Sequence, residues 1–263
     1  MALLDKNTDV NFVNTTAIVT GGGSGIGAAM VKFLHDRGSK VTIVDIDEEA
    51  GHGLSADIGC DYAYLDVSDL TGWEKLTTKI TDRNGSLDIL CLNAGIGSRP
   101  RGHTVTDDPI PWIRDTYRNV INVNVDGVVY GTLAAIPFME RQGSGSIIVT
   151  ASVAGIRTQP PDPIYALSKS AVIGFVRSIA PSLTERGIFI NALCPGSVDT
   201  PLQPEDRRLA GKEMSDPNEI AEAMVQILGS ETTGGIWIAT SPDFPVWRYE
   251  FASSMDGPPT ELA

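Results

Sequence analysis

The chain has 263 residues, of which 42% are hydrophobic and 20% are charged, and its net charge is −13 at pH 7. This composition is that of an ordinary globular protein, and the length is sufficient to bury a large core without disulfides or metals. Because so negative a surface repels a phosphate backbone, the charge argues against a nucleic-acid-binding protein.

Short apolar runs alternate with longer amphipathic stretches along the chain. The runs that predict strands are residues 16–20, 40–45, 62–65, 87–92, 146–151, 188–193 and 235–239. The stretches that predict helices are residues 25–37, 47–55, 69–83, 112–140, 163–185 and 216–229. Several strands are apolar on consecutive residues, which is typical of a parallel sheet covered by helices on both faces. No linker divides the chain, so we expect one domain over residues 1–263.

A glycine-rich turn stands where the first predicted strand passes into the first predicted helix. In the run TGGGSGIG, Gly21 lets the chain turn sharply, Gly25 lets the backbone approach a ligand, and Gly27 lets helix and strand pack together. The N–H groups at the start of that helix face outward and suit a pyrophosphate. Such a turn alone is a weak signal, but a strand before it and a helix after it favour a dinucleotide site.

The second predicted strand ends on acids. Asp45 stands where a carboxylate accepts hydrogen bonds from ribose hydroxyls, and Asp47, Glu48 and Glu49 follow it. A 2′-phosphate there would meet these charges with no basic residue nearby, and like charges at ~4–6 Å cost about 1 kcal/mol or more near a surface. Glu48 and Glu49 are also ordinary acids for the start of a helix, but Asp45 predicts NAD rather than NADP.

Tyr165 and Lys169 lie four residues apart on the predicted helix 163–185, and hence on one face of it. Asp162 and Pro163 before them have the pattern of an N-cap and a first helical residue. An ammonium close to a phenol favours the phenolate, so we expect the pKa of Tyr165 to fall toward working pH. Such a tyrosine can remove the proton from an alcohol while a hydride leaves the same carbon.

Two more polar residues are expected at this site. Ser152 follows the predicted strand 146–151, at the edge of the sheet where the glycine turn also lies, and its hydroxyl can hold the substrate oxygen against the tyrosine. Asn124 stands inside a long predicted helix, where asparagine has poor propensity. A buried asparagine needs hydrogen-bond partners, which can include a water leading toward Lys169. A purely structural Asn124 is the alternative.

In order and spacing these features resemble the short-chain dehydrogenase/reductase family over nearly the whole chain. The matching motifs are T-G-x-x-x-G-x-G at 20–27, D-V at 66–67, N-A-G at 93–95, Asn124, Ser152, Tyr165-x-x-x-Lys169 and P-G at 195–196. The resemblance implies a single doubly wound, Rossmann-type α/β domain with a mostly parallel seven-stranded sheet. It also implies a homodimer or homotetramer, assembled through the long helices that carry Asn124 and Tyr165.

The resemblance also assigns roles to residues. Tyr165 would be the general acid/base, Ser152 would orient and polarise the substrate oxygen, and Lys169 would bind the nicotinamide ribose and tune Tyr165. Asn124 would hold a water that relays the proton to solvent. The cofactor-binding residues that it implies are Gly21, Ser24, Gly25, Ile26, Gly27, Asp45, Ile46, Asp66, Val67, Asn93, Ala94, Gly95, Tyr165, Lys169, Pro195, Gly196, Val198 and Thr200.

The expected substrate region departs from the common family pattern. The C-terminal tail, 241–263, is similar to that of 15-hydroxyprostaglandin dehydrogenase-like members, which also favour NAD and oxidation. An aromatic cluster in the tail either walls an apolar substrate pocket or pins the tail to the body; its members are Phe244, Trp247, Tyr249 and Phe251. The expected substrate loops are 96–112 and 198–215, and His103 is expected to be a solvated loop residue.

The first residues, the length of the apolar runs and the cysteines indicate the cellular compartment. Residues 1–12 lack a basic leader and an apolar signal core, and no apolar run approaches the ~18 residues of a membrane span. The cysteines, Cys60, Cys91 and Cys194, lie far apart without CxxC spacing, so no metal site is predicted. A reducing, cytoplasmic location fits this pattern.

The sequence therefore predicts an NAD-dependent enzyme that oxidises a secondary alcohol to a ketone. Its substrate would be a fairly apolar small molecule such as a hydroxy-lipid, steroid, terpenoid or other secondary metabolite. The alternatives are NADPH-dependent carbonyl reduction or a non-redox cyclisation on the same fold, and a cofactor-binding scaffold or redox sensor without turnover. The acids after the second strand argue against NADPH, and the presence of Tyr165 and Lys169 argues against a silent scaffold.

Overall fold

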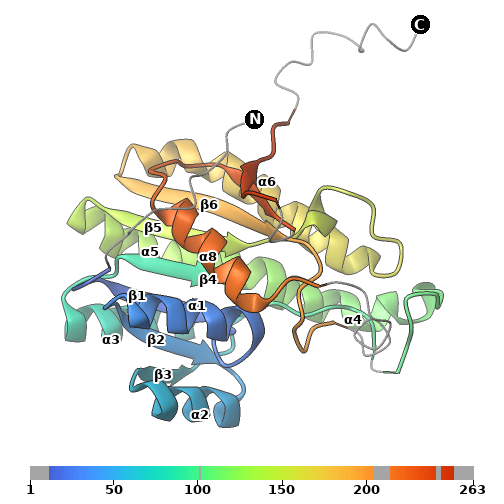
Figure 1. Ribbon diagram of the computed structural model, residues 1–263, viewed down its shortest axis with the longest axis horizontal. Helices are drawn as coiled ribbons and strands as arrows, with labels where there is room; N and C mark the ends of the chain where they lie inside the picture. Colours follow the sequence, from blue (N-terminus) through green and yellow to red (C-terminus); the bar gives the residue numbers. More distant parts are fainter. Residues whose placement is uncertain (1–11, 101, 204–213, 241–243, 252–263) are drawn as a thin grey trace, which may run out of the picture.

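A sheet forms the middle layer of the molecule, and helices cover both of its faces (Figure 1). The computed structural model describes residues 12–100, 102–203, 214–240 and 244–251. Within these ranges the strands are β1 (Thr16–Thr20), β2 (Lys40–Asp45), β3 (Asp61–Tyr64), β4 (Ile89–Leu92), β5 (Gly145–Thr150), β6 (Ile188–Pro195), β7 (Ile236–Ala239) and β8 (Trp247–Arg248). The helices in these ranges are α1 (Gly25–Asp36), α2 (Glu48–Ile58), α3 (Leu70–Asn84), α4 (Ile110–Ile121), η1 (Asn122–Asp126), α5 (Gly127–Gln142), η2 (Val153–Gly155), α6 (Pro163–Thr184) and α8 (Pro217–Leu228).

The strands lie in the order β3-β2-β1-β4-β5-β6-β7-β8. Strands β1 to β7 are all parallel, so their carboxyl ends meet at one edge of the sheet. The direction of winding reverses between β1 and β4, which is where doubly wound sheets bind ligands. The predicted doubly wound α/β fold is confirmed, and each predicted strand has both ends within about two residues of the observed ones.

The seven predicted strands form the parallel part of the sheet, and the tail adds an eighth strand, β8, at its edge. Trp247 and Arg248 pair antiparallel with Ile238 and Trp237 of β7. The N–H of Tyr249 also donates to the carbonyl of Ile236, at 2.7 Å. A strand of two residues leaves no periodic pattern in a sequence, so only the contact with β7 reveals it.

The long helix predicted over residues 112–140 is divided into three parts. The α-helices α4 and α5 are joined by a single π-helical turn, η1, which contains Asn124. Such turns insert a residue into an α-helix and are frequent at functional sites. The run 110–142 is long and apolar enough to cross a membrane by length and composition, but it is a helix of the core: 44% of its most apolar window is buried against the rest of the protein.

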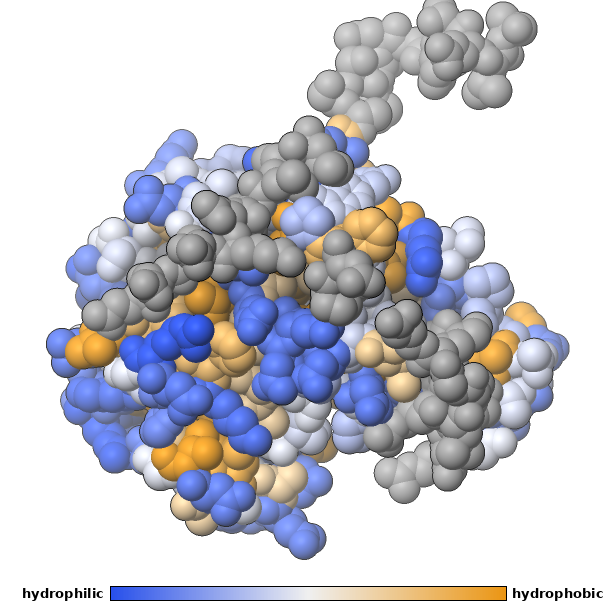
Figure 2. Space-filling view, in the orientation of Figure 1, coloured by the Kyte–Doolittle hydropathy of each residue, from blue (hydrophilic) through white to orange (hydrophobic). Residues whose placement is uncertain are grey.

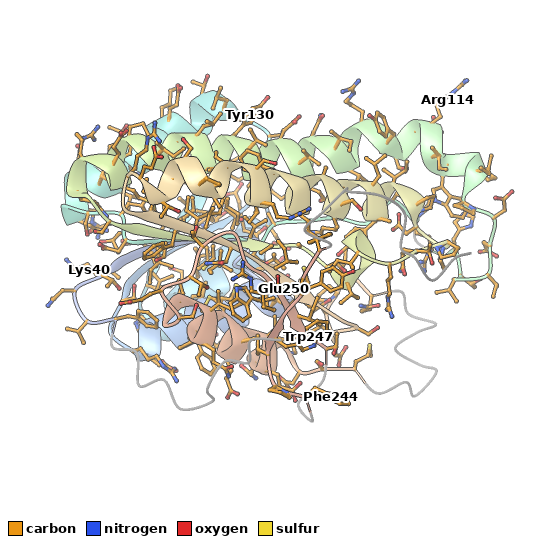
Figure 3. The ribbon with its side chains drawn as sticks, turned by 90° about the horizontal axis from the view of Figure 1, so that it is seen from above. Lys40, Arg114, Tyr130, Phe244, Trp247 and Glu250 are labelled. Atoms are coloured by element: carbon orange, nitrogen blue, oxygen red, sulfur yellow. The ribbon has the colours of Figure 1, made fainter. Side chains whose placement is uncertain are left out.

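Two apolar clusters hold the three layers together. On one face of the sheet, α3, α5 and α6 bury residues such as Trp73 and Met139. On the other face, α1 and α8 bury residues such as Leu34 and Met224. Figure 3, viewed from above, has α5 and α6 on one side of the sheet and α8 on the other. Because both faces are covered, the central strands are apolar on consecutive residues, as their sequences indicated.

The outer surface is mixed. Figure 2 shows mostly hydrophilic residues on the visible face, with apolar residues gathered in small separate patches. Scattered apolar residues of this kind are normal on a protein surface.

Candidate active site

One cleft lies at the carboxyl ends of the parallel strands, with a volume of about 430 Å³, which is in the range of small-ligand sites. Its lining brings together all of the predicted site residues except Gly27 and Asn124: Gly21, Ser24, Gly25, Ile26, Asp45, Ile46, Asp66, Val67, Asn93, Ala94, Gly95, Ser152, Tyr165, Lys169, Pro195, Gly196, Val198 and Thr200. Residues about 180 positions apart in the chain therefore face one another.

The glycine turn brings the backbone unusually close to its neighbours. Gly21 and Gly25 have positive φ angles of 60° and 51°, which disfavour any residue with a side chain. A Cβ on Gly25 would lie 3.0 Å from the side chain of Thr200, across the mouth of the cleft. A Cβ on Gly27 would lie 2.0 Å from the carbonyl oxygen of Gly21, so Gly27 serves the packing of α1 under the turn. The turn is thus a cradle that side chains would fill.

Asp45 is fixed at the mouth of the cleft by backbone donors. Its Oδ2 accepts the N–H of Gly23 at 2.9 Å, and its Oδ1 accepts the N–H of Asp47 at 3.0 Å. Asp47 in turn caps α2 by accepting the N–H of Ala50. The carboxylate therefore has one position, next to the glycine turn, where it can accept further bonds from hydroxyls and repels an added phosphate.

The floor of the cleft is tied together by a threonine that the sequence analysis did not single out. The buried hydroxyl of Thr20 accepts the N–H of Asn93 at 2.9 Å and the N–H of Ala94 at 3.0 Å. The side-chain amide of Asn93 donates to the carbonyl of Thr20 at 3.1 Å. These bonds hold the ends of β1 and β4 at a fixed separation. The signal for Thr20 was present, since it begins the glycine motif.

Tyr165, Ser152 and Lys169 form the polar end of the cleft. The hydroxyl of Tyr165 is hydrogen-bonded to the side chain of Ser152. The Nζ of Lys169 lies 5.6 Å from the centre of the Tyr165 ring and donates to the carbonyl of Thr150 at 2.7 Å. Helix α6 positions both residues one turn apart, and the N-cap Asp162 fixes the start of that helix. This arrangement can hold an alcohol oxygen between Ser152 and Tyr165.

The prediction that the pKa of Tyr165 falls was wrong for the chain alone. Burial raises the pKa of Tyr165 to about 12, and the bond with Ser152 only partly opposes this effect. Burial also lowers the pKa of Lys169 to about 8. Lys169 is 97% buried and its ammonium donates to a carbonyl, so loss of hydration outweighs the attraction between the two charged forms.

Asn124 lies behind the cleft. Its Oδ1 accepts the N–H of Ile96 at 2.8 Å, and its Nδ2 donates to the carbonyl of Ile96 at 2.9 Å and to the hydroxyl of Ser168 at 3.0 Å. Ser168 donates onward to the carbonyl of Tyr165 at 2.7 Å. Both N–H groups of the Asn124 side-chain amide therefore donate hydrogen bonds within the protein, and the side chain fixes the backbone beside Tyr165. The predicted role in holding a relay water stays a prediction.

Thr150 is a second residue that the sequence analysis missed. Its side chain lines the cleft and is 92% buried, and its hydroxyl has no hydrogen-bond partner among the described residues. A buried hydroxyl normally finds a partner, so this one fits a ligand that occupies the cleft. Together with the glycine cradle and the fixed Asp45, it fits a nicotinamide dinucleotide. Its place two residues before Ser152 was the signal that could have found it.

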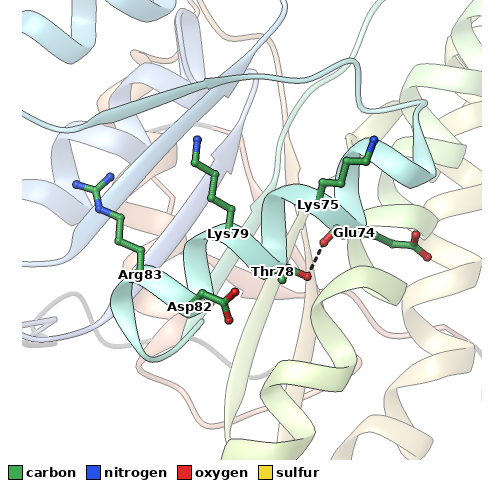
Figure 4. A pocket seen from close by; sticks show the side chains of 6 residues that line it. All are labelled: Glu74, Lys75, Thr78, Lys79, Asp82 and Arg83. Carbon is green, nitrogen blue, oxygen red and sulfur yellow. Dashed lines mark hydrogen bonds between the residues drawn. The ribbon is translucent and has the colours of Figure 1, made fainter.

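A shallower hollow over α3 has none of this machinery. It is lined by Glu74, Lys75, Thr78, Lys79, Asp82 and Arg83. Lys75, Lys79 and Arg83 project to one side of the helix (Figure 4), and Arg83 pairs with Asp61 at 2.9 Å. Such alternating charges are those of a solvated helix face.

Comparison with known proteins identifies the family. A family model described as short chain dehydrogenase matches residues 15–210. The chain belongs to the short-chain dehydrogenase/reductase family. The motifs that carried the resemblance all lie in the matched range, and the family implies a nicotinamide cofactor.

Relatives of this short-chain dehydrogenase have several names. Short-chain dehydrogenase/reductase prx6 of Penicillium rubens is 37% identical; the match covers 70% of this chain and 64%, less than two thirds, of that protein. 3beta-hydroxysteroid dehydrogenase 2 of Eggerthella lenta is 32% identical over 84% of this chain and 90% of that one. The crystal structure of gox2181 has a TM-score of 0.76 at 27% identity, covering 88% of this chain and 95% of that chain.

The described part of the dehydrogenase's tail contacts the body of the domain. Trp247, Tyr249 and Phe251 pack against the core, and the guanidinium of Arg177 lies 3.8 Å from the centre of the Phe251 ring. Phe244 is 66% exposed, and Figure 3 shows it at the periphery. None of these four rings is among the described residues that line the cleft, and Trp247, Tyr249 and Phe251 hold the tail against the body of the domain. The resemblance of the tail to 15-hydroxyprostaglandin dehydrogenase-like members stays a prediction, and residues 241–243 and 252–263 lie outside the described residues.

The predicted substrate loops border the cleft in part. Ile96 and the segment 200–203 line it, whereas residues 101 and 204–213 lie outside the described residues. His103 is 44% exposed on its side chain, stacks on Trp112 with ring centres 4.6 Å apart, and lies 3.4 Å from the carboxylate of Asp107. It is a surface loop residue that is held in place by two neighbours.

Proposed function

We propose that this protein is an NAD-dependent oxidoreductase that oxidises a secondary alcohol of a fairly apolar small molecule to a ketone. The observation that carries the proposal is that Tyr165, Ser152 and Lys169 lie together in the cleft that the glycine turn borders. None of these three polar side chains forms an ion pair with a carboxylate of the described residues, which suits a neutral oxygen that loses a proton.

The chain's own groups divide the work. Ser152 donates to the substrate oxygen and holds it beside the phenol, and Tyr165 takes the hydroxyl proton. The Lys169 ammonium stabilises negative charge on the phenol and hydrogen-bonds ribose hydroxyls. When bound, the nicotinamide supplies a hydride acceptor. Ser152 and Lys169 are buried and Tyr165 is half-buried beside them, which limits the water that can compete for the proton.

NAD is preferred over NADP in this proposal because of Asp45. Its carboxylate is held by the N–H groups of Gly23 and Asp47, and Glu48 and Glu49 follow on the first turn of α2. A 2′-phosphate would bring two further negative charges to this corner. A ribose 2′-hydroxyl would instead donate to a fixed acceptor.

An apolar alcohol is supported by apolar side chains in the lining of the cleft. Ile96, Pro201 and Leu202 are among them. A relative at 32% identity is named a 3beta-hydroxysteroid dehydrogenase, and a steroid hydroxyl is an apolar secondary alcohol. Hydroxy-lipids, terpenoids and other secondary metabolites share this chemistry.

We also propose a cytoplasmic homodimer or homotetramer. Tyr117 on α4, Leu133 on α5 and Leu167 on α6 are 39%, 48% and 47% exposed. Apolar residues on adjacent long helices support a helix-to-helix contact between copies.

Purified protein assayed against a panel of steroid, hydroxy-fatty-acid and terpenoid alcohols, with NAD and NADP in parallel, tests the function. Reduced cofactor formed from NAD and an alcohol is the expected result. Turnover only with NADPH and ketones would instead favour a carbonyl reductase. Tight NAD binding without turnover on any member would favour a scaffold or sensor.

A further inference from the structure

A buried carboxylate just outside the cleft joins two segments that border the catalytic group. Asp162 is 7% exposed and is the N-cap of α6, where its Oδ1 accepts the N–H of Tyr165 at 3.1 Å. The same Oδ1 accepts the hydroxyl of Ser98, and Oδ2 accepts the N–H of Ser98 at 3.0 Å. Ser98 is itself 1% exposed. One side chain thus binds both the loop after β4 and the first turn of α6.

Each of the two joined segments also contributes a nearby residue to the lining of the cleft. Ile96, two positions before Ser98, lines the cleft and has its backbone bonded to Asn124. Tyr165 lies three positions after Asp162. Between them, a Cβ on Gly97 would lie 3.1 Å from Oδ2 of Asp162, so the loop passes directly over the carboxylate.

Capping α6 alone does not require a buried charge. Serine and asparagine cap helices as well as aspartate does, and burying a carboxylate has a large desolvation cost unless it is fully hydrogen-bonded. Asp216 offers the comparison, because it also precedes a proline and caps α8, but it is exposed and bonds only within its own helix start. Asp162 differs from it by reaching across to another loop.

We propose that Asp162 is a positioning residue, whose carboxylate holds the loop 96–98 against the start of α6 and so sets where the substrate oxygen meets Tyr165. This inference rests on the proposed function, since the alcohol oxygen is what the two segments would align. Asp162 does not line the cleft, so it acts through Ser98 and Tyr165 and not on the substrate.

The charge of Asp162 gives the proposal a pH signature. The titratable groups that act on the phenol are Asp162 and Lys169 on α6 and Cys194 on β6, with Ser152 as its hydrogen-bond partner. The negative charge of Asp162 raises the pKa of Tyr165. Removing that charge without removing the cap therefore lowers the pKa of the catalytic base.

Three variants of the full chain separate three effects of Asp162: the capping of α6, the hydrogen bonds to Ser98 and the negative charge. Asp162→Asn keeps a cap and removes the charge and the acceptor for the Ser98 N–H. Ser98→Ala keeps the cap and the charge and removes one bond of the tie. Asp216→Asn is the matched control, with the same change at a helix cap remote from Tyr165. The alcohol-oxidation assay gives kcat, KM and the pH midpoint of kcat, and thermal unfolding is measured in parallel.

The expected result has two parts. Asp162→Asn moves the pH midpoint of kcat down by about 0.5–1 unit and raises KM for the alcohol, whereas Ser98→Ala raises KM and leaves the midpoint in place. Asp216→Asn changes neither. KM and midpoint in Asp162→Asn equal to those of the wild type would overturn the proposal and leave Asp162 a helix cap.

The unfolding measurement tests the tie without relying on turnover. Asp162→Asn and Ser98→Ala should each lower Tm by about 4–8 °C, and the double variant should lower it by less than the sum of the two shifts, because each variant weakens the same tie. Full additivity of the two shifts would refute the tie. If the wild type oxidises no alcohol but the Tm shifts of the two variants are still less than additive, the tie exists and the proposed function is wrong.

Discussion

The Nζ of Lys169 donates to the carbonyl oxygen of Thr150 at 2.7 Å, which joins α6 to the end of β5 beneath the catalytic tyrosine. The bond holds the ammonium 5.6 Å from the centre of the Tyr165 ring. Lys169 therefore has one fixed place, between α6, which carries Tyr165, and the end of β5, two residues before Ser152.

Lys169 should make stability depend on pH in a defined window. Its pKa is lowered to about 8 in the folded chain, from 10.5, so between these values the unfolded chain binds more protons and stability rises with pH. The free energy of unfolding of the wild type should therefore rise relative to that of Lys169→Met by about 2–4 kcal/mol between pH 7.5 and 10.5. Denaturant titrations across this range measure it. Lys40→Met, at an exposed lysine, should show no such trend, and a flat difference for Lys169→Met would contradict the assigned burial effect.

Asp45 should decide the choice of cofactor. Asp45→Ala combined with Ile46→Arg should lower kcat/KM for NAD by about 10–100-fold, because a charged acceptor for the ribose hydroxyls is lost, and raise kcat/KM for NADP. Steady-state assays with both cofactors measure the change. Glu48→Gln, on the exposed first turn of α2, is the control and should change the preference far less, because Glu48 is not the fixed acceptor of the ribose hydroxyls. A wild type that already prefers NADP would contradict the claim that Asp45 selects NAD.

The hydroxyl of Thr150 should matter for cofactor binding more than for folding. Thr150→Val removes a buried donor without a described partner, so stability should stay equal or rise slightly, while the Kd of the cofactor should rise by about 5–10-fold through one lost hydrogen bond. Thr132→Val is the matched control, since the Thr132 hydroxyl donates to Val128 within α5 at 2.8 Å. That variant should lose stability and keep its cofactor affinity. Unchanged affinity in Thr150→Val would mean that its hydroxyl does not contact the cofactor.

The tail should stabilise the fold without shaping the described cleft. Trp247→Ala removes the ring that packs on the core and stacks near Tyr249, at 6.1 Å between ring centres. It should lower the free energy of unfolding by about 2–4 kcal/mol and leave KM for the alcohol unchanged. A large rise in KM without loss of stability would support the other reading, in which the aromatic cluster walls the substrate pocket.

The sequence predicted the features that depend on local patterns. The strand bounds of β1 and β2, the glycine turn and the one-turn spacing of Tyr165 and Lys169 follow from residues close together in the chain. The lining of one cleft by most of the predicted residues follows from the rule that parallel strands end at one edge.

What the sequence did not reveal depends on contacts between distant segments. β8 exists only through its pairing with β7, and the bond between Ser98 and Asp162 spans 64 residues. The direction of the Tyr165 pKa shift depends on how deeply the phenol is buried, which spacing alone cannot give. The four-residue spacing predicted that Lys169 lies near Tyr165, but it could not predict how much hydration the two side chains lose on folding.

The most direct test of the account is the rate of NAD reduction by Tyr165→Phe, compared with the wild type, on an alcohol that the wild type oxidises. General-base catalysis by the phenol predicts a fall in kcat of about 10²–10⁴-fold, with the Kd of NAD unchanged. Tyr130→Phe, on α5 outside the cleft, should keep full activity and rules out a general effect of losing a phenol. A Tyr165→Phe enzyme that turns over at the wild-type rate would contradict the assignment of the base.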